Sequence, residues 1–211
     1  MIKRDKTIMA VHRLEGKIYY EDNIPHYEGR PIICKDSPVD GGVSIGQYER
    51  EAIVVDSQKS NSLLSLYEKA KKRAMFKGQV DKALILLSVF KVVSEKLKYD
   101  SSKVEKIVKK AGVKKDKKIN LENFVKAEAG ICTHQALLCG VLLELFIKDK
   151  YLRGKVSVDR NSVYRNGHAW CRYTTSGGKV FIMDVANDFM GSLEKGLEKG
   201  IWCYNRAEDG V

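Results

Sequence analysis

Three residues of the types that carry out acyl transfer follow one another in the second half of this 211-residue chain: Cys132, His168 and Asp184. A thiolate is a strong nucleophile, an imidazole can move its proton, and a carboxylate can hold that imidazole in one tautomer. Cys132 stands near the start of a predicted helix, where unpaired N–H groups and the macrodipole favour thiolate over thiol. We therefore predict that Cys132 is a nucleophile.

Two neighbours of Cys132 in the stretch "AGICTHQALL" need separate treatment. Gly130 removes a side chain just ahead of the cysteine, which would let a substrate backbone come close, so we predict that it binds substrate. His134 is a poor base for Cys132, because two residues on a helix correspond to a rotation of about 200° and their side chains point apart. We expect His134 to be a partly exposed helix residue.

The base and its partner are predicted further along the chain. His168, in "NGHAW", stands at the start of a predicted strand, and Asp184, in "FIMDV", follows sixteen residues later across a predicted hairpin. A carboxylate among apolar residues is costly to bury without a partner, and a histidine across the hairpin would supply one. Taken singly, each residue has a structural explanation, but their order and placement favour a catalytic triad.

Strand geometry restricts how that hairpin can be built. Opposed residues of an antiparallel pair share a face, and their numbers have a constant sum. His168 and Asp184 sum to 352, whereas a two-residue loop at the centre of "TSGG" gives an odd sum and turns Asp184 to the other face. We therefore predict a three-residue loop at residues 175–177, or a bulge at Gly177 or Gly178, and a hydrogen bond between His168 and Asp184.

The three segments together resemble a known family. "GICTHQALL", "GHAWCRY" and "VFIMDV" are similar to the signature blocks of the transglutaminase-like superfamily, over about residues 129–188. The family's closing acid is often followed by proline, and here Asp184 is followed by Val185. The matches to the family's Gly-x-Cys-x-x-x-Ala and His-Ala-Trp motifs are Gly130, Cys132, Ala136, His168, Ala169 and Trp170.

The resemblance implies acyl transfer through a thioester. Cys132 would attack an amide carbonyl of a protein or peptide, His168 would pass the proton, and Asp184 would orient His168. We favour hydrolysis, of the protease or deamidase type, because water needs no binding site, and protein-glutamine transglutamination stays open as the alternative. The triad requires no metal and no organic cofactor.

Other parts of the site are less determined by the sequence. Trp170 would share a strand face with His168, so it either lines the site as a substrate-binding residue or packs under the Cys132 helix. The N–H of Cys132 would be one oxyanion donor. Lys126 occupies the position where papain-like enzymes often have a glutamine, which leaves the second donor unassigned.

Periodicity predicts an α+β fold with a papain- or transglutaminase-like core, in which the catalytic helix packs on an antiparallel sheet and the first half adds further helices. We expect one domain over residues 1–211, with an irregular β region at 1–60, a helical region at 61–127, and the catalytic helix and sheet at 128–211. Helices are predicted at 63–76 (capped by Asn61 or Ser62), 80–98, 102–111 (capped by Ser101 or Ser102), 131–148 and 192–199, and strands at 155–158, 168–174, 179–186 and 201–205.

Composition restricts the compartment. The chain is 44% hydrophobic and 31% charged, and its longest apolar run, "ALILLSVFKVV", is too short to span a membrane. The charged N-terminus has no signal-peptide core, so we expect synthesis as a cytoplasmic protein, with export by another route left open. Five cysteines without a C-x-x-C pair indicate reduced thiols and neither a disulfide scaffold nor a zinc site.

A basic segment offers a different class of function. Residues 96–118 hold ten lysines against three acids, within a chain of net charge +11. The simplest interpretation is a solvated helix face and loop, and the alternative is a module that binds an acidic protein, nucleic acid or a membrane surface. Tyr99 is its only aromatic residue and no DNA-binding motif is present, so nucleic acid is the partner we expect least.

Overall fold

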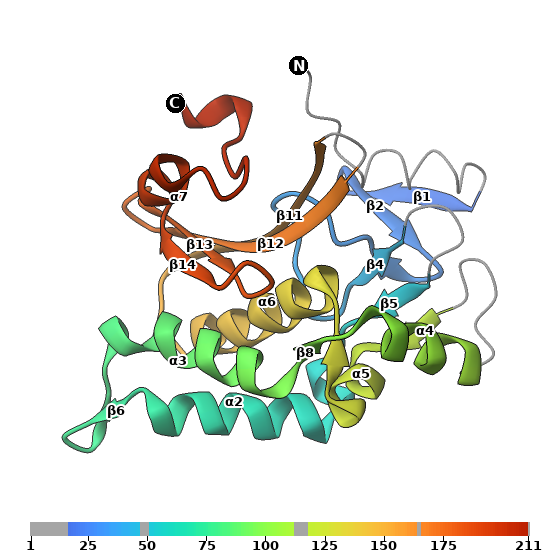
Figure 1. Ribbon diagram of the computed structural model, residues 1–211, viewed down its shortest axis with the longest axis horizontal. Helices are drawn as coiled ribbons and strands as arrows, with labels where there is room; N and C mark the ends of the chain where they lie inside the picture. Colours follow the sequence, from blue (N-terminus) through green and yellow to red (C-terminus); the bar gives the residue numbers. More distant parts are fainter. Residues whose placement is uncertain (1–16, 47–50, 112–117, 164–165, 211) are drawn as a thin grey trace.

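The computed structural model describes residues 17–46, 51–111, 118–163 and 166–210, and it has a mixed α+β fold (Figure 1). The predicted α+β class is confirmed. Its largest sheet has four antiparallel strands in the order in which they occur in the chain. These strands are β11 Gly154–Val163, β12 Asn166–Thr175, β13 Val180–Asp184 and β14 Phe189–Ser192.

The central helix of the fold is α6, Cys132–Lys148, as the sequence predicted. It packs against the sheet on one side and against α2 Asn61–Arg73 and α3 Lys82–Lys96 on the other, which gives three layers (Figure 1). Nearly all its residues from Cys132 to Phe146 are buried, and this explains a sequence that is apolar on every side. The layers position the N-terminus of α6 near one end of the sheet.

Two predicted helix caps are wrong. The Ser60 side chain accepts from the Leu63 N–H at the start of α2, and Asp100 accepts from the Lys103 N–H at the start of α4, Ser101–Lys110. An N-cap residue has extended backbone and bonds to the N–H two or three positions on, which Ser60 and Asp100 do. The residues we predicted as caps lie inside the helices.

The predicted end of the first helix is also wrong. α2 stops at Arg73, and the next residues form a two-strand hairpin, β6 Met75–Phe76 and β7 Gln79–Val80. Lys77 and Gly78 both have positive φ, at 49° and 79°, as a tight two-residue hairpin turn requires. The turn that reverses the chain toward α3 is therefore a β-hairpin.

The remaining elements form small sheets and short helices. Residues 201–205, predicted as a strand, have no strand geometry and instead run across the four-stranded sheet.

The other elements are β1 Ile18–Glu21, β2 Ile24–Tyr27, β3 Arg30–Pro31, β4 Val43–Ile45, β5 Ala52–Val54, η1 Ser57–Lys59, β8 Lys98–Tyr99, β9 Lys118–Asn120, α5 Leu121–Ala127, β10 Ala129–Gly130, α7 Leu193–Lys199 and η2 Ala207–Asp209.

The basic segment is only partly described, because residues 112–117 of it lie outside the described ranges. Lys96 pairs with Glu128 at 2.7 Å and Lys118 with Glu28 at 2.9 Å, so these two lysines serve local contacts. Binding of an acidic partner by the segment stays a prediction. So does the division of the chain into three regions of one domain.

No helix among the described residues is both long enough and apolar enough to cross a membrane.

Candidate active site

Cys132 is the first residue of α6, where we predicted it. The chain reaches it through β10, which pairs in parallel with β8 and ends at Gly130. A side chain at Gly130 would have its Cβ 3.0 Å from the Cβ of His134, so this close approach is one physical reason for glycine at the position. Substrate binding by Gly130 stays a prediction.

His168 and Asp184 meet across the hairpin, as predicted. His168 Nε2 lies 2.6 Å from Asp184 Oδ2. The carboxylate is only 1% exposed, and it also accepts from the Tyr204 hydroxyl at 2.8 Å and from Asn187 Nδ2 at 2.8 Å. The Asn187 backbone N–H donates to Oδ1 at 3.3 Å, so four donors compensate the cost of burying this charge.

The numbers of paired residues in the β12–β13 hairpin have an even sum, as predicted, but the loop lies one residue further along the chain than predicted. Partners such as Cys171 and Met183 sum to 354. Thr175 N donates to Lys179 O at 2.9 Å, so the three-residue loop is 176–178 and not 175–177. Gly178, at φ 83°, supplies the left-handed residue that such a loop needs.

The shifted register also explains how Cys132 reaches the pair. The pairing of β12 with β13 ends at Cys171 and Met183, so His168 and Ala169 have no partner on β13. The Ala169 N–H donates to the Cys132 thiol, and Cys132 also has a side-chain hydrogen bond with His168. Nε2 of His168 faces Asp184, which leaves Nδ1 for the thiol. The end of the helix thus meets the exposed edge of a strand.

The contacts shift both pKa values in the direction that favours an ion pair. Burial alone would raise the pKa of Cys132, but the hydrogen bond and charge of His168 and the Ala169 N–H outweigh it and lower that pKa. Burial would lower the pKa of His168, but Asp184 and Cys132 raise it to about 9. At neutral pH these directions favour thiolate and imidazolium together.

His134 does not lie where we expected. It is fully buried, with its ring 4.0 Å from the ring of Phe124, so the prediction of a partly exposed residue is wrong. Its Nδ1 accepts the Ile131 N–H at 3.2 Å, which leaves the ring proton on Nε2, 3.5 Å from a carboxylate oxygen of Glu51. His134 therefore secures the residue that precedes Cys132.

Trp170 lies on the same sheet face as His168, away from α6. Its ring stacks on His168 with centroids 6.1 Å apart and meets Tyr204 edge-on at 5.4 Å. Packing under the Cys132 helix is therefore wrong for Trp170. It is 3% exposed, and its predicted substrate binding stays a prediction.

The C-terminal segment, residues 201–209, contributes side chains that the sequence analysis missed. Trp202 meets the His168 ring edge-on at 4.9 Å and donates through Nε1 to Asn161 at 2.7 Å. Arg206 bonds Asp159 on β11 with its Nε at 2.7 Å. The tryptophan and tyrosine of "IWCYNR" were a partial signal, since these side chains usually pair their N–H or O–H with a polar partner when they are buried.

Two other cysteines take the structural places we predicted. Cys139 and Cys171 are fully buried in the apolar cluster between α6 and the sheet, and burial raises both pKa values. Lys126 pairs with Glu122 at 3.0 Å on the surface of α5, so its side chain has a local partner. Among the described residues, no group of three or more His, Cys, Asp or Glu side chains could hold a metal ion.

A pocket of about 240 Å³ adjoins the residue before Cys132. It lies between α4 and Ile131, and its lining includes two acidic residues, Glu51 and Glu105, and one basic residue, Lys109. Glu51 is 7% exposed. The other lining residues are Ser101, Val104 and Val108.

The protein thus has an α+β fold in which a helix-start cysteine packed on an antiparallel sheet lies beside a hydrogen-bonded histidine and aspartate of a hairpin of that sheet. A family model described as a transglutaminase-like domain matches residues 72–191, more than half of the chain, and the chain belongs to that family. No curated protein and no solved structure matches it.

Proposed function

We propose that the protein is a cysteine-dependent amidase that acts on amide bonds of proteins or peptides through a thioester. The single observation that carries the proposal is the buried 2.6 Å contact between His168 and Asp184, with Cys132 hydrogen-bonded to the same imidazole. Membership of the transglutaminase-like family supports the same class of chemistry.

In the acylation step, the Cys132 thiolate attacks the amide carbonyl, and the carbonyl oxygen takes the negative charge. The Cys132 N–H, unpaired at the start of α6, is the donor we assign to that oxygen. His168 then gives its proton to the leaving amine, and a thioester remains on Cys132. Asp184 stabilises the charged imidazole and keeps its Nδ1 directed at the thiol.

In the second step the imidazole, now neutral, takes a proton from water, and the resulting hydroxide attacks the thioester. The acid product leaves, and the proton restores the imidazolium and thiolate pair. Water reaches the thioester without a binding site of its own, which is why we place hydrolysis first.

The decisive experiment compares wild type with Cys132→Ala on a complex protein substrate, followed by mass spectrometry. New peptide termini that depend on Cys132 identify a protease, and a one-dalton rise at glutamine identifies a deamidase. Cys139→Ala is a control that also removes one thiol from α6. Equal products from wild type and Cys132→Ala would overturn the proposal.

A second candidate function is transfer of the acyl group to an amine, and the pocket beside Ile131 favours it. A lysine side chain has an aliphatic stem and a cationic end, which match Val104, Val108 and the carboxyl groups of Glu51 and Glu105. Lysine isopeptides among the products would identify this reaction. Glu105→Gln should then raise the KM for the amine and leave hydrolysis unchanged.

A further inference from the structure

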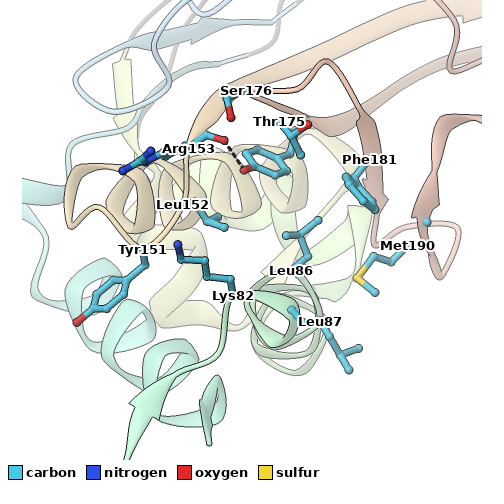
Figure 2. A pocket seen from close by; sticks show the side chains of 13 residues that line it. Lys82, Leu86, Leu87, Tyr151, Leu152, Arg153, Thr175, Ser176, Phe181 and Met190 are labelled. Atoms are coloured by element: carbon cyan, nitrogen blue, oxygen red, sulfur yellow. Dashed lines mark hydrogen bonds between the residues drawn. The ribbon is translucent and has the colours of Figure 1, made fainter.

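A pocket lined by residues of α3, β12, β13 and β14 lies far from Cys132 and plays no part in the proposed chemistry. It has a volume of about 490 Å³ and sits where the N-terminus of α3 approaches the turn between β12 and β13 (Figure 2). His168 lies near the start of β12 and Thr175 ends that strand, so at about 3.3 Å per residue the two lie roughly 20 Å apart. The volume falls within the range of roughly 300–1,000 Å³ typical of small-molecule sites.

The body of this pocket is apolar. Leu86 from α3, Phe181 from β13 and Met190 from β14 point toward one another across it (Figure 2). The Tyr173 hydroxyl donates to the Arg153 carbonyl at 2.8 Å, so it is already engaged. A ligand body therefore has to be hydrocarbon, because a polar group would lose its water without a replacement partner.

The rim of the pocket is basic. Lys82 and Arg153 line it, and its lining contains no acid among the described residues. The nearest acid in sequence, Asp81, is occupied as the cap of α3 by the Ala83 N–H at 2.8 Å. Lys179 lies 5.3 Å from the centroid of the Phe181 ring and adds a further positive charge at this end of the sheet.

The rim is also held in place. The Arg153 carbonyl accepts from the Tyr173 hydroxyl and from the Ser176 N–H at 3.2 Å, which ties Arg153 to the β12–β13 turn. Leu87, on the outer wall, is 42% exposed. Leu87 lines the pocket, so a ligand chain that fills the pocket would also cover part of this side chain.

We propose that this pocket binds an anionic amphiphile, an aliphatic chain that ends in a carboxylate. The chain lies against Leu86, Phe181 and Met190, and the carboxylate lies at Lys82 and Arg153. This inference does not depend on the proposed amidase activity.

The test is calorimetric titration of the intact protein with hexanoate, octanoate and decanoate, each below the concentration at which it forms micelles. We expect saturable binding with one site, and an affinity that rises about three- to fourfold for each added methylene. Decylamine should bind at least tenfold more weakly than decanoate, because its charge is repelled by the basic rim.

Two matched pairs of variants locate the site. Lys82→Glu should weaken decanoate binding at least tenfold, whereas Lys91→Glu makes the same charge change elsewhere on α3 and should not. Leu87→Asp should weaken binding as well, whereas Leu64→Asp, at an equally exposed leucine of α2, should not.

Three results would overturn the inference. They are equal binding of decylamine and decanoate, an affinity that does not depend on chain length, and equal loss in the two members of either variant pair. Binding of a peptide through a free C-terminal carboxylate, with no binding of decanoate, would assign the pocket to a protein partner and would also reject the proposal.

Discussion

The two faces of the β12–β13 hairpin are built from the same strands and are held by different kinds of contact. One face packs on α6 with Ala169, Cys171, Tyr173 and Met183, all part of one apolar cluster. The other carries His168, Trp170, Arg172 and Asp184 under the C-terminal segment. Apolar contacts are non-directional, so the first face tolerates a change of partner as long as volume is kept.

The second face is held by specific hydrogen bonds between individual polar groups. Arg172 bonds Asp209, Asn161 Nδ2 donates to the Cys203 carbonyl at 2.8 Å, and Tyr204 donates to Asp184. These polar groups are buried or half-buried, and removing a partner from one of them leaves a donor or acceptor unsatisfied and lowers stability. The comparison teaches that changes on the α6 face should cost stability, whereas changes on the other face should cost activity.

The largest expected effect comes from His168. We expect His168→Ala to lower the rate by about 10²–10⁴-fold, since it removes the proton carrier. Cys171→Ala, three residues along the same strand but on the α6 face, should keep the rate and lower the free energy of unfolding by about 1–2 kcal/mol. The measurements are the turnover rate and the thermal unfolding of both variants. A similar loss of rate in both would contradict the functional difference between the two faces.

Asp184→Asn should have the next largest effect. The amide can present an N–H to His168, which favours the wrong tautomer, and a rate loss of roughly 10²–10⁴-fold is the expectation from catalytic triads. The neighbouring Met183→Ala should keep the rate but lose about 2–5 kcal/mol of stability, because it leaves a cavity beside α6. Full activity in Asp184→Asn would reject the orienting role.

The pH dependence of the rate tests whether Cys132 and His168 act together. As pH falls through the lowered pKa of Cys132, the thiolate is protonated and the rate falls. As pH rises through about 9, His168 loses the proton it must donate, and the rate falls again. We expect a bell-shaped profile whose acid limb lies below the ordinary range of a cysteine.

Limiting iodoacetamide on the native protein measures the thiol directly. Cys132 should be the first site labelled near pH 6.5, and His168→Ala should slow its labelling about tenfold or more by returning its pKa toward the ordinary value. Cys139 and Cys171 should stay unlabelled because they are 0% exposed and burial raises their pKa values, whereas Cys132 is 9% exposed and its pKa is lowered. Faster labelling of Cys171 or Cys203 than of Cys132 would show that the wrong thiol has been assigned.

The smallest expected effect separates two tyrosines. Tyr204→Phe removes a hydrogen bond to Asp184, and Tyr173→Phe removes one to Arg153 on the opposite face. Each should lower stability by about 1 kcal/mol. Only Tyr204→Phe should also lower the rate, by a few-fold, because only its partner holds His168. Kinetics that change equally in both variants would show that the effect is one of stability alone.

Local rules accounted for much of the fold and for part of the site. The start of α6 at Cys132 and the strand that carries His168 followed from helix and strand periodicity, which act within a few residues. The even register sum followed from the requirement that a catalytic His168 and Asp184 share a face. The turn was misplaced by one residue because both "TSG" and "SGG" fit a three-residue loop. His134 was misjudged because the sequence does not reveal that Phe124 and Glu51 enclose it.

The sequence by itself determined which residue types stand at the helix start and on the two strands, and strand alternation restricted the loop lengths that would let His168 and Asp184 share a face. Only the tertiary structure decided what covers that face. Trp202, Tyr204 and Arg206 reach it from a segment with no regular secondary structure, whose path depends on polar contacts with residues far away in the chain. Such contacts leave no periodic pattern, because they depend on three-dimensional position and not on spacing along the chain.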